Sequence, residues 1–300
     1  MLPRMPPHHP VLDPAVAYPK INELRAALDA RDWTACRALL DAAEPVERGF
    51  LIDAAAEAAE VAGFLRGVRT ADPADSTAAA LLGRHLTVVA GSAERWRAAE
   101  IELIDAAARA PDDPAVWAAR LGTARLLGLG QSEARRRYDR LAAIDPHFLP
   151  GQSGFARQLC PQWGGDWDRA HEFARSAAEA APPGSLSHVL IAEVHIEHWL
   201  ALRDTAARRT YLAADAVRSG LYDAAKSSVW HADFRRTHGW VHVMNVFAVA
   251  FALLDDMPAV ASLFTALDGL ATGWPWSCLG DPVTVISQYA ERALPDGGAA

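Results

Sequence analysis

The sequence predicts an all-α fold in which pairs of antiparallel helices stack into an α-solenoid, and two observations support this. The composition is 51% hydrophobic and rich in Ala, with Leu and Arg, which favours helices. An apolar pattern that starts with alanine and ends with proline also recurs about every 35 residues, a period typical of stacked helical repeats. Its three copies are Ala99, Leu103, Ala106 and Pro111; Ala134, Tyr138, Leu141 and Pro146; and Ala170, Ala174, Ala177 and Pro182.

Each copy has the features of a helix that packs against a neighbour and then ends. Spacings of four and three residues place its first three side chains on one stripe of a helix. The leading alanine lets another helix approach closely, and the second residue fills the space beside it. The proline ends the helix, since it has no amide hydrogen to donate and clashes with a further turn. Each copy therefore predicts the second helix of a packed pair.

The remaining elements follow from capping residues and helix breakers. Residues 1–17 are rich in proline and are expected to be a disordered tail, and 295–300 a second tail. Asp32 and Asp166 are the expected N-caps of the helices that follow them. An insertion over 203–237 is expected to add two irregular helices. We predict helices over 18–29, 33–43, 45–58, 59–69, 76–91, 93–110, 115–129, 131–144, 151–160, 165–181, 185–202, 239–254, 257–270 and 282–293, the last as a cap.

The stretch 115–148 resembles the tetratricopeptide repeat (TPR), a helix–turn–helix unit of about 34 residues. The residues that match this family are Leu121, Gly122, Ala134, Tyr138 and Pro146, and those that depart from it are Trp117, Arg125 and Leu141. The resemblance implies a TPR-like single domain over 18–294, with a close helix contact at Gly122. Its repeats are expected near 76–111, 115–148, 151–182 and 185–272, the last interrupted by the insertion. The runs 163–165 and 195–199 are similar to actinobacterial helical-repeat proteins, a resemblance that implies no activity.

Charge, cysteine content and hydropathy argue against several classes of protein. A net charge of −8 and a pI near 5.7 do not suit a nucleic-acid partner. Cys36, Cys160 and Cys278 are too scattered for a disulfide framework or a metal site. Residues 1–10 lack the apolar core of a signal peptide, and no apolar run is long enough to span a membrane. We therefore expect a cytoplasmic protein without a membrane partner, and its oligomeric state stays open.

The TPR resemblance also implies a ligand-binding groove, lined by the first helix of each pair. The polar residues that fall in this groove are Arg157, Glu193, Glu197, His242 and Asn245. We predict that they contact an extended peptide or a partner protein. The chain contains no recognised nucleophile motif, phosphate-binding loop or zinc-protease motif, so no catalytic residue is assigned and no cofactor is expected.

A second hypothesis is a small-molecule binder or a metal-dependent enzyme, with a pocket roofed by 203–237. Glu193 and Glu197 lie four residues apart, as do His238 and His242. Two carboxylates and two imidazoles that converge from neighbouring helices could hold a divalent transition metal. Under this hypothesis the four residues are the metal ligands.

Aromatic residues and histidines also gather in the C-terminal half. Trp230, Trp240 and Trp274 near the insertion suggest either helix packing or a pocket for a small apolar ligand. His188 and His195 are expected to be core histidines. A buried imidazole needs a hydrogen-bond partner, and we expect these histidines to find partners in each other or in the insertion.

Overall fold

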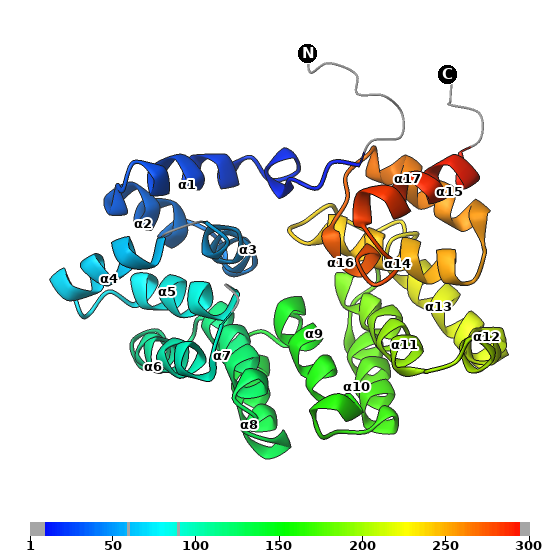
Figure 1. Cartoon of the computed structure of the whole chain (residues 1–300), viewed down its shortest axis with the longest axis horizontal. Helices are drawn as coiled ribbons and strands as arrows, with labels where there is room; N and C mark the ends of the chain where they lie inside the picture. Colours follow the sequence, from blue (N-terminus) through cyan, green and yellow to red (C-terminus); the bar gives the residue numbers. More distant parts are fainter. Residues whose placement is uncertain (1–9, 59–60, 89–90, 295–300) are drawn as a thin grey trace, which may run out of the picture. The chain divides into compact units, whose positions relative to one another are not determined.

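The computed structural model describes residues 10–58, 61–88 and 91–294 (Figure 1). These residues form seventeen α-helices and three short 3-10 helices and contain no β-strand, which confirms the predicted all-α class. None of the described helices is both long enough and apolar enough to cross a lipid bilayer. The tail predicted over 295–300 lies outside the described residues.

Contacts between residues group the helices into two compact units. The N-terminal unit is Tyr18–Ala170. The C-terminal unit begins at His171 within helix α10 and also includes the start of the chain, up to Ala17. The single repeat domain predicted over 18–294 stays a prediction.

The N-terminal unit consists of successive helices that each pack against their neighbours in the chain. Helix α5 packs against α3, α4 and α6, and α7 packs against α6, α8 and α9. Aspartate N-caps begin several of these helices, including the predicted one at Asp32, which accepts a hydrogen bond from the amide of Ala35 at 3.0 Å. The helices are α1 (Lys20–Asp29), α2 (Trp33–Asp41), α3 (Pro45–Ala56), α4 (Val61–Ala71), α5 (Ser76–Val88), α6 (Ala93–Arg109), α7 (Pro114–Leu126), α8 (Gln131–Ile144) and α9 (Leu149–Gln158).

The predicted apolar stripe faces the core of this unit. Ala99 and Leu103 on α6 are fully buried, and so are Ala134 and Leu141 on α8. The remaining large member of the α8 stripe, Tyr138, stacks on the ring of Phe155 in α9, with ring centroids 4.5 Å apart. The spacing of four and three residues therefore identified the buried face of both helices.

The close helix contact predicted at Gly122 is not there. A Cβ atom placed on Gly122 would meet no atom within 4 Å. The tight contacts lie at Gly83 on α5, whose Cβ would stand 2.6 Å from Leu103 Cγ, and at Gly151 on α9, whose Cβ would overlap the side chain of Leu141. The repeat resemblance thus placed the glycine contact on the wrong helix.

A buried ionic cluster joins α6, α7 and α8. The carboxylate of Glu100 accepts hydrogen bonds from Arg120 at 2.9 Å, from Arg137 at 2.8 and 3.0 Å, and from the hydroxyl of Thr123. Arg137 is 2% exposed and also donates to Glu133 at 2.7 Å. Burial alone would raise the pKa of Glu100, but the hydrogen bonds from Thr123, Arg137 and Arg120 outweigh it and lower this pKa.

The C-terminal unit continues from α10 with a second set of packed helices. Helix α11 packs against α13 and α14, and α14 packs against α15 and α16. The N-cap predicted at Asp166 begins α10 and accepts from the amide of Arg169 at 2.8 Å. The helices are α10 (Trp167–Ala180), α11 (Val189–Ala201), α12 (Thr205–Ala213), α13 (Asp215–Ser227), α14 (Trp240–Leu253), α15 (Met257–Leu267), α16 (Gly273–Trp276) and α17 (Pro282–Ala293), with short 3-10 turns at Pro14–Val16 and Leu186–His188. A third 3-10 turn, Pro161–Trp163, precedes α10 and belongs to the N-terminal unit.

The range predicted as an insertion, 203–237, supplies the packing partner of α11. Its two helices are α12 and α13, in agreement with the number predicted. The second of these helices, α13, packs directly against α11, which also packs against α14 after the predicted insertion. Helices α14 and α15 then pack together as a separate pair.

The segment 10–17 is ordered, in contrast to the disordered tail predicted over 1–17. The amide of Val11 donates to the carbonyl of Gly269 at 2.8 Å, and the amide of Ala271 donates to the carbonyl of Val11 at 2.9 Å. Ala15 in the following 3-10 turn is 3% exposed. These backbone bonds to a distant part of the chain overcome the local effect of the prolines. Residues 1–9 lie outside the described residues.

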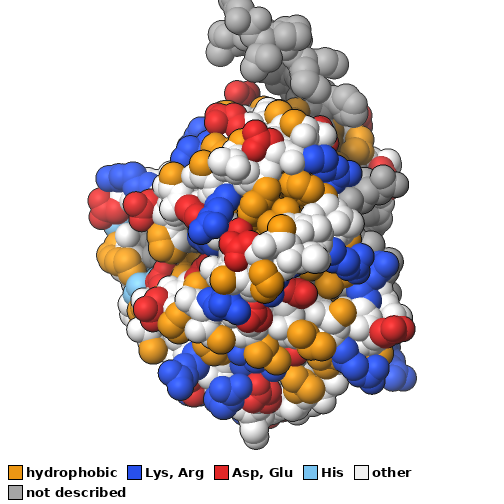
Figure 2. All heavy atoms as spheres, turned by 90° about the vertical axis from the view of Figure 1, so that its left-hand side faces the viewer, with side chains coloured by type: hydrophobic (Ala, Val, Ile, Leu, Met, Phe, Trp, Pro, Cys, Tyr) orange, Lys and Arg blue, Asp and Glu red, His pale blue; other side chains and the backbone are white. Residues whose placement is uncertain are grey.

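Acidic and basic side chains alternate on the surface of the described chain. On the face drawn in Figure 2, the two signs are interspersed and apolar side chains occur in small groups between them. Pairs within single helices contribute to this pattern, such as Arg37 with Asp41 at 3.0 Å and Arg135 with Asp139 at 2.8 Å. Such exposed pairs contribute little stability, about 0.3–0.5 kcal/mol each.

Candidate functional site

The structure brings together two of the predicted groove residues, one from α11 and one from α14. His242 Nε2 donates a hydrogen bond to Glu193 Oε1 at 3.1 Å. The Glu193 residue is 6% exposed, whereas the side chain of His242 keeps 31% of its surface exposed. The pair therefore places a mostly buried carboxylate behind an imidazole that solvent can reach.

An aromatic ring completes this arrangement. The indole of Trp274, from the turn that begins α16, stacks on the imidazole of His242 with centroids 5.4 Å apart and planes 20° apart. Sequence reasoning named Trp274 as an aromatic residue near the last repeat but did not connect it to His242. We call Glu193, His242 and Trp274 the Glu–His–Trp site.

Asn245 was predicted to contact a ligand, but its side chain holds the fold. It is fully buried, its amide nitrogen donates to the carbonyl of Val241 at 2.8 Å, and its oxygen accepts from the indole of Trp276 at 2.7 Å. Trp276 is itself fully buried. This amide therefore anchors α16 against α14 and presents no surface to a partner.

The other predicted site residues lie at different places in the fold. Glu197 lies one turn after Glu193 on α11 and is partly exposed. His238 lies in the turn before α14 and not on the helix, so its predicted helical spacing with His242 is wrong. Arg157 is partly buried on α9, in the N-terminal unit.

The four-residue metal site is not assembled. Across the described residues, no group of three or more His, Cys, Asp and Glu side chains is placed to hold a metal ion. Of the four ligands proposed from the sequence, the hydrogen-bonded pair that the structure forms is Glu193 with His242. Glu193 and Glu197 are one turn apart on α11, as predicted. His238 is not one helical turn from His242, because α14 begins at Trp240.

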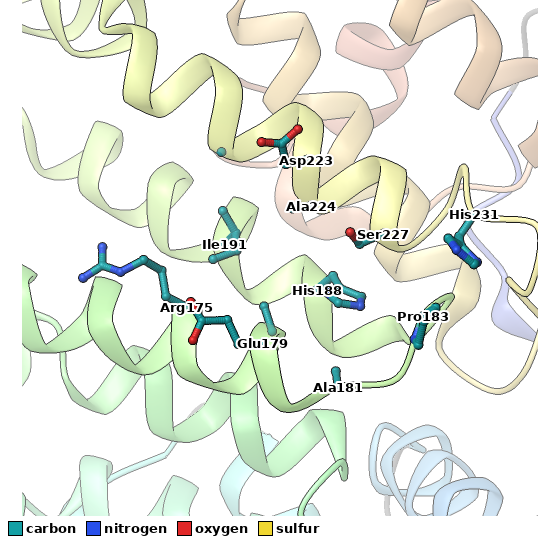
Figure 3. Close-up of a pocket in the computed structure, with 12 residues that line it drawn as sticks. Arg175, Glu179, Ala181, Pro183, His188, Ile191, Asp223, Ala224, Ser227 and His231 are labelled. Carbon is teal, nitrogen blue, oxygen red and sulfur yellow. The ribbon is translucent and has the colours of Figure 1, made fainter.

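A separate open pocket of about 600 Å³ lies between α10, α11 and α13 (Figure 3). Its lower wall in that view is α10 and its upper wall is α13, with the turn that precedes α11 between them. The walls carry charges of both signs. The lining residues are Arg175, Ala178, Glu179, Ala181, Pro183, His188, Ile191, Gly220, Asp223, Ala224, Ser227 and His231.

The two histidines that line the pocket each form a hydrogen bond with the backbone. His188 Nε2 donates to the carbonyl of Pro182 at 3.3 Å, and His231 Nδ1 accepts from the amide of Asp233 at 3.1 Å. Burial lowers the pKa of His188 and outweighs the hydrogen bond to Pro182, which raises it. The neighbouring His231 lowers the pKa further, so His188 is neutral at pH 7. His188 is buried, as expected of a core histidine, but its hydrogen-bond partner is the carbonyl of Pro182 and neither another histidine nor the predicted insertion.

The predicted insertion does line this pocket, through α13 and the residues after it. The residues expected beneath it, Glu193, Glu197 and His242, are not among the lining residues. Sequence reasoning missed Arg175 and Glu179. Their i,i+4 spacing on α10 was visible, but it also occurs on any solvent-exposed helix and so could not identify a pocket.

No protein-family model matches this chain, and no curated protein matches its sequence.

Proposed function

We propose that this chain is a TPR-like helical-repeat protein that binds an extended peptide segment of a partner protein at the Glu–His–Trp site. Support for the repeat arrangement comes from the packing of successive helices. In the N-terminal unit, α5 with α6 and α7 with α8 form neighbouring pairs, and Tyr138 of one pair stacks on Phe155 of the next helix. In the C-terminal unit, α11 with α13 and α14 with α15 continue the pattern.

The chemistry of Glu193 carries the proposal. Among the described residues its one hydrogen bond comes from His242, so its second carboxylate oxygen has no donor from the protein. A mostly buried carboxylate is stabilised by further N–H donors, which a peptide backbone or a basic side chain supplies. The exposed edge of His242 and the ring of Trp274 offer a flat surface next to it, where a peptide side chain can pack.

The test is peptide selection with matched variants. Phage-displayed random linear peptides are selected on the wild type, and the affinity of an enriched peptide is measured by fluorescence anisotropy. We expect Glu193→Gln and His242→Ala to weaken binding about tenfold or more, because each leaves a polar partner unsatisfied. Glu291→Gln, which alters an exposed carboxylate on α17, is the control and should bind normally. Enriched peptides that bind both site variants as tightly as the wild type would contradict the proposal.

A second candidate function is the binding of a small polar molecule in the pocket between α10, α11 and α13. Its supporting observation is the pocket itself, whose walls carry Arg175, Glu179 and Asp223. A thermal-shift screen with small polar compounds tests it, with Glu179→Gln/Asp223→Asn as the pocket variant. A compound whose stabilisation is lost in this variant but kept in Glu193→Gln would favour the second candidate over the first.

A further inference from the structure

Three histidines and a tyrosine from α10, α11 and α12 meet in the C-terminal unit. His171 Nε2 lies 3.0 Å from His198 Nδ1, and His195 Nδ1 lies 2.5 Å from the hydroxyl of Tyr211. The same hydroxyl lies 3.4 Å from His171 Nε2, which links the two pairs. We call these four residues the His–Tyr cluster. Their meeting confirms the expectation that histidines pair with each other and with the predicted insertion.

The cluster suits neutral imidazoles. His171 Nε2 and His198 Nδ1 can share one hydrogen between them, so both rings cannot be fully protonated in this position. A tyrosine hydroxyl that donates to His195 Nδ1 requires that nitrogen to be unprotonated. All four hydrogen-bonding atoms are therefore satisfied when the three rings carry no charge.

The groups around the cluster oppose a positive charge. Burial, followed by His171, His198 and Arg175, lowers the pKa of His195 to about 3. Burial also lowers the pKa of His198 and raises that of Tyr211. Arg175 on α10 pairs with Glu172 at 2.7 Å.

Two groups at the borders of the cluster complete its charged surroundings. Arg208 of α12 lies 4.6 Å from the centre of the Trp199 ring. Glu197 of α11 lies between His195 and His198 in the sequence.

Helix α12 packs against α11 and against α13, the next helix in the chain. None of its residues is buried. Besides Tyr211, it is attached through Arg208, whose guanidinium donates to the carbonyls of Leu202 at 2.9 Å and Leu200 at 3.3 Å. Because no residue of α12 is fully buried, apolar packing contributes little to holding the helix, and the tyrosine–histidine contact has a large share.

We propose that α12 is a proton-released lid, held on α10 and α11 at neutral pH by the His–Tyr cluster and freed when its histidines take up protons in mildly acidic solution. The histidines bind protons weakly in the closed form and with ordinary affinity in the open form, so a lower pH favours opening. The pKa of His195 is about 3 in the closed form and takes the ordinary value of 6.5 in the open form. This difference alone raises the equilibrium constant for opening about 30-fold when the pH falls from 7.5 to 5. His198, whose pKa burial also lowers, adds to this change.

Hydrogen–deuterium exchange of the full chain, read by mass spectrometry, tests the lid. The measured quantity is the protection of the amides of 208–213 at pH 7.5 and pH 5, corrected for the intrinsic effect of pH on exchange. We expect the wild type to lose about 30-fold or more in protection. His195→Gln keeps an oxygen that can accept from Tyr211 but cannot take up a proton, and should reduce the loss to a few-fold. Tyr211→Phe should lower protection at both pH values.

His147→Gln, which changes an exposed histidine of the N-terminal unit, is the control and should behave as the wild type does. Three results would overturn the proposal: wild-type protection of α12 that stays constant between the two pH values, a full pH response in His195→Gln, or an equal loss of protection in α14 and α15. The last result would mean that acid unfolds the unit as a whole and does not release one helix.

Discussion

The two units each contain a polar cluster that joins three consecutive helices, buried in the N-terminal unit and partly buried in the C-terminal one, and the two clusters differ in charge. In the N-terminal unit, Glu100 accepts hydrogen bonds from Arg120 and Arg137, so opposite charges meet and stay ionised. In the C-terminal unit, the histidines of the His–Tyr cluster bond to one another and to Tyr211, and burial lowers the pKa of His195 and of His198. We therefore expect mild acid to leave the stability of the N-terminal cluster unchanged and to weaken the C-terminal one.

The largest expected effect comes from breaking the ionic cluster. Arg137→Ala should lower the free energy of unfolding by about 3–5 kcal/mol, because it leaves the buried carboxylate of Glu100 short of donors. The measurement is urea denaturation followed by circular dichroism. Arg135→Ala removes a largely exposed arginine from the same helix and should cost less than about 0.5 kcal/mol. Equal effects of the two variants would show that the cluster contributes no more than a surface pair does.

The second prediction concerns the pH range in which each cluster loses its contribution to the free energy of unfolding. The depressed pKa of His195 gives stability that is complete above pH 6.5 and is lost as pH falls below it, by about 2 kcal/mol at pH 5. Hydrogen bonds from Arg136, then Arg137, lower the pKa of Glu133 to about 2 against the raising effect of burial, so its contribution is lost only below pH 4.5.

Between pH 7.5 and pH 5, amide exchange corrected for the intrinsic effect of pH should therefore increase in α12 and stay constant in α6, α7 and α8. Destabilisation of these three helices already at pH 6 would contradict the assignment of two separate pH ranges.

The smallest effect concerns packing in the N-terminal unit. Gly83→Ala should lower the free energy of unfolding by about 1–2 kcal/mol, because the added methyl group overlaps the buried Leu103 and this exceeds the gain in helix propensity. Gly122→Ala is the matched variant. It has open space and should raise stability by up to about 1 kcal/mol. Thermal melting of both variants measures the difference. Destabilisation by Gly122→Ala would show that the close helix contact predicted from the repeat exists after all.

Much of the fold was predictable because its signals are local. The N-caps Asp32 and Asp166 act within three residues, and both predicted bonds form. The buried stripe of α6 and α8 follows from the period of the helix itself. The ordered segment around Val11 was not predictable in this way, because it is held by backbone bonds to Gly269 and Ala271, far along the chain.

The candidate site was predictable in part. Glu193 and His242 were assigned to one groove from their places in neighbouring helices, and they do meet. Asn245 was assigned by the same register, yet its amide faces the core and binds Trp276. Register predicts which turn of a helix a residue occupies, but a small rotation of the helix decides whether its side chain faces a partner or the interior.

The sequence by itself determined the all-α class, the succession of helices, their caps and the buried face of the repeated stripe, since these depend on residues three or four positions apart. Only the tertiary structure decided which polar groups meet. His171 and His198 are 27 residues apart, and Glu193 and His242 are 49 apart. Contacts over such separations depend on how each helix is rotated against its neighbour, which is set by the packing of all the side chains between them.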